Sequence, residues 1–366
     1  MKVERLCFEG FRNLQAGELA PDKGVNVIYG NNAQGKTNLL EAIWLFTGGR
    51  SFRGAKDREL IAFDAEFSRV ALDYEAFGRR QQAKLLISAG KRQATLNGVE
   101  KPSASSLIGE FCAVVFSPAH LSLIKEGPSE RRRFIDAAIC QLKPAYAALL
   151  SRYNHTLSQR NALLKDISYH SELYDTLEIW EEKLARYGAA VSLERIRYAG
   201  RLKEEAAALY AGIAGNREAF SLCYRPAFQK GEAELDSLTR DLRACLRENR
   251  REDIINGVTG FGPHRDELQI TLNGKSARSF GSQGQQRSCV LALKLSEASI
   301  LKESIGELPV ILLDDVMSEL DAMRQDYILN HIEGFQVFIT CCEKETVKKS
   351  LTGKTFCMDA GAMLMA

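Results

Sequence analysis

The sequence reads Gly30-Asn31-Asn32-Ala33-Gln34-Gly35-Lys36-Thr37 directly after the apolar run Val25–Tyr29. The octet fits the pattern G-x-x-x-x-G-K-[ST], in which glycines let backbone N–H groups turn inward around phosphate groups. The helix-like stretch Asn38–Phe46 follows, and its positive N-terminus would point at the same phosphates. In such a loop Lys36 reaches the β- and γ-phosphates and the Thr37 hydroxyl ligates Mg²⁺. The pattern predicts a nucleotide-binding α/β fold, with Lys36 facing solvent when no phosphate is bound.

A second apolar run, far downstream, ends in two carboxylates. Val310–Leu313 is followed by Asp314 and Asp315, which is typical of a buried parallel strand with acids at its C-terminal end. Asp314 would hold Mg²⁺ directly or through water, and Asp315 could polarise an attacking water. Mg²⁺ can bridge Thr37 and Asp314 only if both strands belong to one sheet, so we expect a single sheet.

A third motif begins a predicted helix. Ser282-Gln283-Gly284-Gln285 precedes a helical pattern that runs through Glu303. A serine at this position offers a hydroxyl, free N–H groups and the helix dipole, which together favour an anion. The alternative is an ordinary Ser-capped helix with a polar first turn. Ser318–Asp321 follows the acidic strand, and Val337–Thr340 predicts another buried strand.

These motifs, in this order, resemble the ABC-type ATPase heads of transporters and of SMC-like DNA repair proteins. The finer match is to the RecF family of bacterial DNA replication and repair proteins. It rests on Phe8–Asn13, Gly30–Asn38, Phe116–Pro118, Pro128–Asp136, Gln159–Asn161, Gly262–Asp266 and Ser282–Arg287. The resemblance runs from the first residues to about Thr340, and Cys341–Ala366 offers nothing distinctive.

The resemblance implies an α/β fold, an ABC-type P-loop ATPase head with an inserted helical arm. In such heads the S-x-G-Q turn of one subunit covers the γ-phosphate of ATP held by the other, so ATP and Mg²⁺ would join a homodimer that slow hydrolysis releases. The implied catalytic residues are Lys36, Asp314 and Asp315, and the implied metal ligands are Thr37 and Asp314. The implied nucleotide contacts are Gly30, Asn31, Asn32, Ala33, Gln34, Gly35, Lys36, Thr37, Asn38, Ser282, Gln283, Gly284 and Gln285.

The family resemblance also implies partners. They are gapped DNA and single-strand/duplex junctions, together with the RecR and RecO proteins, in promoting recombinase loading. Two other classes stay open: a soluble ATPase subunit of a transporter, and a phosphotransferase. The S-x-G-Q turn argues against a phosphotransferase, which needs no lid from a second subunit. The match at Phe8–Asn13 and the residues around Arg131–Asp136 argue against a transporter subunit.

Three zones appear along the chain. Residues 1–118 predict the N-terminal part of the head, 119–254 a helical insertion, and 255–366 the C-terminal part of the head. We expect strands at Asp73–Phe77, Lys84–Ser88, Thr95–Val99, Ala113–Phe116 and Leu268–Leu272, with hairpin turns at Asn97-Gly98 and Asn273-Gly274. In the helical zone a short seam on one helix face predicts a compact arm with a core. The seam consists of Leu173, Leu177, Trp180, Leu184, Tyr187 and Val191.

Composition adds only broad limits. A net charge of +2 predicts no strong nonspecific attraction to polyanions, and we expect the basic clusters at 50–58, 79–80, 91–92 and 131–133 to be solvated faces. Nine cysteines without a C-x₂-C pair suit the reducing cytosol. The polar N-terminus and the lack of long apolar stretches argue against a membrane-embedded role. His264, beside a proline, invites a general-base role, but we favour a structural one.

Overall fold

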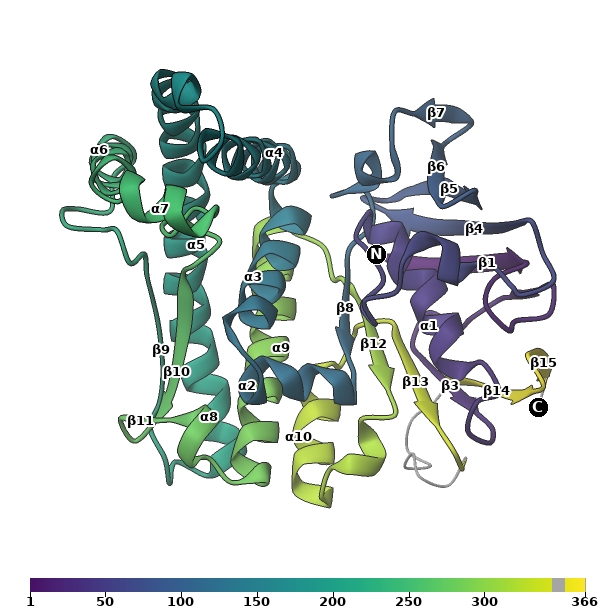
Figure 1. The fold of residues 1–366 in the computed structure, drawn as a ribbon. Coiled ribbons are helices and arrows are strands. Elements are labelled where there is room, and N and C mark those ends of the chain that lie inside the picture. The colour runs from purple at the N-terminus through teal and green to yellow at the C-terminus, as the bar shows by residue number, and fades with distance from the viewer. Residues whose placement is uncertain (344–352, 366) are drawn as a thin grey trace. The chain divides into compact units, whose positions relative to one another are not determined.

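The computed structural model describes residues 1–343 and 353–365. They form two compact units (Figure 1). The first unit comprises Met1–Leu121, Leu209–Asn216 and Arg287–Ala366, and the second comprises Ser122–Ala208 and Arg217–Gln286. The domain boundaries expected after residues 118 and 254 remain a prediction. No helix in the described part of the chain is long and apolar enough to cross a membrane.

A six-stranded sheet forms the centre of the first unit, in the order β15-β14-β3-β13-β12-β8. Its strands are β3 (Val25–Tyr29), β8 (Ala113–Phe116), β12 (Val310–Asp314), β13 (Val337–Cys341), β14 (Gly353–Asp359) and β15 (Ala362–Met365). All neighbours are parallel except β15, which pairs antiparallel with β14. Every residue of β12 and β13 is buried, which explains their unbroken apolar runs. The carboxyl ends of β3 and β12 therefore meet at one edge, as we expected for Thr37 and Asp314.

An antiparallel sheet completes the β structure of this unit, in the order β2-β1-β4-β5-β6-β7. Its strands are β1 (Lys2–Glu9), β2 (Gly17–Leu19), β4 (Phe67–Ala76), β5 (Arg79–Ser88), β6 (Lys91–Leu96) and β7 (Val99–Lys101). Asn97 and Gly98 form the predicted hairpin turn with φ of 52° and 80°. Phe77, expected at the end of a strand, lies in the β4–β5 turn instead. Because Ala76 pairs with Arg79, Phe77 and Gly78 are left as a two-residue loop with positive φ.

Helices in the first unit cover the parallel sheet. Helix α1 (Lys36–Trp44) follows the loop after β3 and packs against β12 and β13 (Figure 1). Helix α10 (Ala322–His331) lies between β12 and β13 in sequence, and most of α9 (Gln283–Ile305) also belongs to this unit. Short 3₁₀ helices occur at Leu45–Thr47, Asp57–Leu60, Ala104–Leu107, Pro118–Leu121 and Met317–Glu319.

The second unit is mainly helical. Its helices are α2 (Ser122–Lys125), α3 (Pro128–Leu142), α4 (Pro144–Ile167), α5 (Leu177–Ala214, which ends in the first unit), α6 (Leu235–Glu248), α7 (Arg250–Asn256) and α8 (Ala277–Phe280), with a 3₁₀ helix at Ser171–Thr176. It also contains a three-stranded sheet, β11-β10-β9, made of β9 (Phe220–Arg225), β10 (Glu267–Leu272) and β11 (Lys275–Ser276). The prediction of a wholly helical zone at 119–254 is therefore wrong at β9. Strand β9 pairs antiparallel with β10, and every second residue of β9 is buried, a pattern of period two.

The predicted apolar seam is part of the core of this unit. Leu177, Leu184 and Val191 on α5 have no exposed surface. Leu177 belongs to a cluster with Leu164 of α4, so the two helices share a core. Leu173 is the exception to the prediction, because it lies in the 3₁₀ helix before α5 rather than on α5 itself.

Candidate functional site

The loop between β3 and α1 has a backbone that only small residues permit. Gly30 has φ of 153°, and a Cβ atom there would lie 2.2 Å from the carbonyl oxygen of Met358. Gly35 has φ of 105°, and a Cβ would lie 2.8 Å from the Leu14 side chain. Ala33 also has positive φ, at 65°. The two glycines of the motif are therefore required by the turn and by the residues packed behind it.

The Lys36 side chain lies inside the loop and bonds to its backbone. Its Nζ donates hydrogen bonds to the carbonyl oxygens of Gly30 at 2.7 Å and Asn31 at 3.0 Å. The side chain is 4% exposed. The expectation that Lys36 faces solvent is therefore wrong. The reason is that the inward-turned carbonyl groups offer the ammonium acceptors within the loop.

A hydroxyl and a carboxylate meet where β3 and β12 end. Thr37 Oγ1 donates to Asp314 Oδ1 at 2.7 Å, and Thr340 Oγ1 donates to the same oxygen at 3.0 Å. Burial raises the pKa of the Asp314 carboxyl, and the hydrogen bonds from Thr37 and Thr340 act in the opposite direction. Thr37 and Asp314 thus bring together two hard oxygen atoms of the kind that Mg²⁺ prefers. No cluster of three or more His, Cys, Asp or Glu side chains suited to a metal is found in residues 1–343 and 353–365.

Asp315 lies directly beyond the strand. Its φ is 52°, so the chain turns out of the sheet at this residue. The backbone N–H of Asp315 donates to Thr340 Oγ1 at 2.9 Å, and its carbonyl accepts from Ser318 Oγ at 2.8 Å. These two bonds fix the backbone of Asp315. Neither involves its side-chain carboxylate, which is half-buried.

The loop is supported from behind by residues that the motif does not contain. Asn13 Nδ2 donates to the carbonyl of Ala33 at 2.9 Å, and Asn38 Nδ2 donates to Asn13 Oδ1 at 2.7 Å. The backbone N–H of Gly361 donates to the Gln34 carbonyl at 3.1 Å, and the N–H of Ala360 donates to the Gln34 side chain. Residues 360 and 361 form the turn of the β14–β15 hairpin, in the stretch where the sequence predicts nothing distinctive. The glycine of that turn is the signal that could have predicted the hairpin.

A buried carboxylate joins the second turn of α1 to the following loop. Glu41 is fully buried and accepts two hydrogen bonds from Arg12, at 3.0 and 3.1 Å, and one from Ser51. Arg53 Nη1 lies 4.0 Å from Glu41 and donates to Asn38 Oδ1 at 2.8 Å. The positive charge of Arg53 also lowers the pKa of the Asp314 carboxyl, although burial dominates. The cluster at 50–58 was expected to be a solvated face, and Arg53 agrees with this, since its side chain is 45% exposed although it bonds to Asn38.

The S-x-G-Q turn belongs to the second unit, whereas Gly30–Asn38, Asp314 and Asp315 belong to the first. Gln285 Oε1 accepts from the Ser282 N–H at 2.7 Å, and Ser282 Oγ accepts from the Gln285 N–H at 3.3 Å. This reciprocal pair is a capping box at the start of α9. Gln285 Nε2 also donates to Glu218 at 2.6 Å. The turn therefore has the geometry of a capped helix, and Ser282 and Gln283 remain exposed.

Arginines from two of the stretches that carry the family resemblance form ion pairs and hydrogen bonds within the second unit. Arg131 forms two hydrogen bonds with Glu267, at 2.7 and 2.9 Å. Arg132 Nη1 donates to the Asp266 carbonyl at 2.8 Å. Arg160 is fully buried and donates to Asp253 at 2.7 Å. The expected solvated face at 131–133 is therefore wrong for Arg131, which is 5% exposed because its guanidinium is held by Glu267 and by the carbonyl oxygens of Leu123 and Glu126.

His264 has a structural environment. Its Nε2 donates to the carbonyl of Thr259 at 2.9 Å, which leaves Nδ1 to accept from the Tyr153 hydroxyl at 2.6 Å. Burial lowers the pKa of His264 to about 4. The imidazole is thus neutral and fully hydrogen-bonded, in agreement with the structural role favoured from the sequence.

Comparisons with known proteins agree with this architecture. The family model described as the RecF/RecN/SMC N terminal domain matches residues 2–361. The DNA replication and repair protein RecF of Acetivibrio thermocellus is 41% identical over 347 residues, which cover 94% of each chain. A solved structure described as the recombination mediator protein RecF with ATP in the RecFOR pathway has 40% identity and a TM-score of 0.93, covering 100% of this chain and 97% of that one.

More distant structures show the same fold. The structure of an Smc head domain from Pyrococcus furiosus aligns with a TM-score of 0.56 and 16% identity. The alignment covers 100% of this chain and 96% of the Smc chain. That likeness confirms the expected α/β fold of an ABC-type ATPase head. The near-complete coverage of relatives at about 40% identity confirms the finer resemblance and does not favour a transporter subunit. This chain belongs to the RecF family of DNA replication and repair proteins.

Proposed function

We propose that this chain is an ATP-dependent DNA-binding protein of replication and recombinational repair, which dimerises on ATP at gapped or junction DNA. The main support for an ATP site is the hydrogen bond from Thr37 Oγ1 to Asp314 Oδ1, at 2.7 Å. It lies beside a loop whose backbone carbonyl at Gly30 bonds to Lys36. The relative solved with ATP at 40% identity supports the same nucleotide. We also propose a cytoplasmic location, which membership of this family of DNA replication and repair proteins supports.

The residues of the loop bind and orient the nucleotide. The backbone N–H groups of Asn31–Lys36 surround the phosphates, and Lys36 exchanges the two loop carbonyls for the β- and γ-phosphates. Thr37 and Asp314 fit Mg²⁺ as hard oxygen ligands, and the bound ion would neutralise the negative charge of the phosphates. Asp315, whose backbone is held on both sides, orients the attacking water. An aspartate reaches less far than a glutamate, which supports slow hydrolysis.

Dimerisation involves the S-x-G-Q turn. Ser282 and Gln283 are exposed at the start of a 23-residue helix whose first turn is fixed by the capping box. In the proposed dimer this turn covers ATP bound by the other copy, so two incomplete sites become two complete ones. ATP would then hold the dimer on DNA, and loss of the γ-phosphate would release it. We propose the RecR and RecO proteins as partners, in promoting recombinase loading.

The experiment that tests this proposal is the variant Ser282→Arg. A bulky, charged side chain at this exposed position should block closure of the dimer without touching the subunit's own loop. We expect ATP affinity of the monomer within about twofold of wild type, and loss of ATP-dependent dimerisation, hydrolysis and retention on gapped DNA. Nucleotide titration, light scattering with and without ATP, and a DNA-retention assay measure these quantities.

The matched control is Ser171→Arg, another exposed serine of the second unit that lies far from this turn in sequence. It should behave as wild type in all three assays. If Ser282→Arg still dimerises with ATP, the dimer model is wrong even for an active ATPase. A phosphotransferase with a single site would instead either tolerate the change or lose nucleotide binding.

A further inference from the structure

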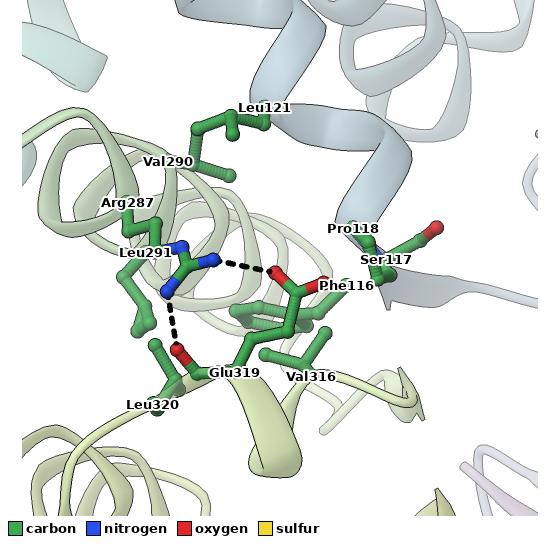
Figure 2. A pocket seen from close by; sticks show the side chains of 10 residues that line it. All are labelled: Phe116, Ser117, Pro118, Leu121, Arg287, Val290, Leu291, Val316, Glu319 and Leu320. Carbon is green, nitrogen blue, oxygen red and sulfur yellow. Dashed lines mark hydrogen bonds and ion pairs between the residues drawn. The ribbon is translucent and has the colours of Figure 1, made fainter. Parts of the chain in front are cut away.

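A small hollow separates helix α9 from the segment after the acidic strand. It lies in the first unit and has a volume of about 40 Å³ (Figure 2). Most of its lining is apolar, including Phe116, Pro118, Leu121, Val290 and Val316. Apolar side chains that face a gap lack van der Waals partners, so small shifts of one wall against the other are inexpensive here.

One ion pair crosses this hollow. Arg287 of α9 donates from Nη1 to the carbonyl oxygen of Glu319 at 2.7 Å, and its Nη2 lies 3.5 Å from Glu319 Oε2 (Figure 2). Both side chains are more than a third exposed, at 37% and 38%. Exposed pairs add little to stability, so a stabilising role does not explain the arrangement.

The pair lies within a continuous series of contacts. Ser318 Oγ donates to the carbonyl of Asp315 at 2.8 Å. Glu319 is the next residue and accepts from Arg287. Beside that contact, Arg324 of α10 donates to Ser288 Oγ at 3.0 Å. The segment that follows the two carboxylates is thus attached to Asp315 on one side and to the first turns of α9 on the other.

Arg287 is incompletely satisfied in this arrangement. Its Nε–H is buried and has no hydrogen-bond acceptor in the part of the chain that the structure describes. A buried donor without a partner is unfavourable, which favours a second arrangement in which the guanidinium or the segment shifts. The hollow beside it provides the space for such a shift.

We infer that Arg287 is a positioning residue that couples the end of β12 to the S-x-G-Q turn of the same chain. Arg287 is two residues beyond Gln285 on the continuous helix α9, so a movement of Glu319 is transmitted to the start of that helix. The occupancy of one nucleotide site then sets the position of the turn that serves the other site. This inference rests on the proposed ATP-dependent dimer and adds a link within each subunit.

The first test is Arg287→Ala, with Lys302→Ala as the matched control. Lys302 is an exposed cation on the same helix. We expect Arg287→Ala to keep ATP affinity within about twofold, to weaken ATP-dependent dimerisation at least about tenfold and to lower kcat by a similar factor. Its thermal stability should match that of wild type, since the pair is exposed. The control should behave as wild type throughout.

The second test separates coupling from direct contact with the partner's nucleotide. Arg287→Glu alone should lose ATP-dependent dimerisation. The double variant Arg287→Glu, Glu319→Arg should regain part of it, at least about threefold, because the side-chain ion pair is restored with reversed polarity while the bond to the carbonyl of residue 319 is not. Unaltered dimerisation of Arg287→Ala, or no recovery in the double variant, would overturn the inference while leaving the proposed dimer intact. If wild type itself does not dimerise with ATP, the proposed function fails first, which distinguishes the two.

Discussion

Replacement of Lys36 by alanine tests the candidate site most directly. In the structure the Lys36 ammonium does not face solvent. It donates hydrogen bonds to the carbonyl oxygens of Gly30 and Asn31, at 2.7 and 3.0 Å. The substitution therefore acts in two ways. It removes a cation from the phosphates, and it leaves two loop carbonyls without their donor.

The size of the effect follows from the exchange of these bonds. A hydrogen bond from a charged donor contributes about 1.5–3 kcal/mol. In wild type the lysine gives up two bonds to carbonyls when it binds phosphates, so only the surplus adds to affinity. We estimate this surplus at about 1.5–3 kcal/mol, which corresponds to ATP binding weakened about 10-fold to 150-fold. A lysine free in solvent would predict a larger loss, of up to about four orders of magnitude. Without nucleotide, Lys36→Ala should unfold about 1–3 kcal/mol more easily.

Two measurements on the same variant check both parts. Titration with ATP gives the change in affinity, and urea denaturation without nucleotide gives the change in the free energy of unfolding. Lys302→Ala, an exposed lysine on α9, is the control and should change neither. ATP affinity within about threefold of wild type would refute the assignment of the phosphate loop. Unaltered stability without nucleotide would refute the role of the two carbonyl contacts.

Two further outcomes are expected. Asp315→Asn should bind ATP and remain dimeric longer than wild type, because Asp314 is kept while the carboxylate proposed to orient water is lost. Phosphate release at the wild-type rate would show that another residue orients the water. Burial lowers the pKa of His264 to about 4 in the folded state, against about 6.5 when unfolded. The stability that the neutral imidazole contributes is therefore complete above a pH of about 6.5. It is lost as pH falls towards 4, by at most about 3 kcal/mol. Denaturation of His264→Asn should accordingly depend less on pH in that window, and an equal dependence would contradict the neutral, buried imidazole.

Local patterns in the sequence predicted strands β3, β8, β12 and β13 of the central sheet, and the loop after β3, but not β14 and β15. Val25–Tyr29 and Val310–Leu313 are apolar runs beside motifs of fixed spacing, and these signals involve only neighbouring residues. Strand β9 could not be separated from the helices around it, because its partner β10 begins more than 40 residues later in the chain. Arg131 looked like part of an exposed cluster, since its partner Glu267 lies 136 residues away.

The errors at the site have the same physical origin. Motif spacing predicts that Lys36 binds phosphates, but it does not show where the ammonium binds without a phosphate. The support of the loop by Asn13 and by the turn at residues 360 and 361 is tertiary, and no pattern local to Gly30–Thr37 contains it. The role of the S-x-G-Q turn remains a prediction, since it concerns a second copy of the chain.

The backing of the phosphate loop by Gly361 has a consequence for biosynthesis. The N–H of Gly361 donates to the Gln34 carbonyl, so the loop is supported by residues more than 300 positions later in the chain. The loop therefore leaves the ribosome long before the hairpin that supports it. The residues of the second unit, 122–208 and 217–286, are all translated in the interval. That unit can therefore fold during translation, as inserted domains with their own core do. The bonds from residues 360 and 361 to Gln34, in contrast, form only once the β14–β15 hairpin has been translated, so we expect a nascent chain to bind nucleotide late.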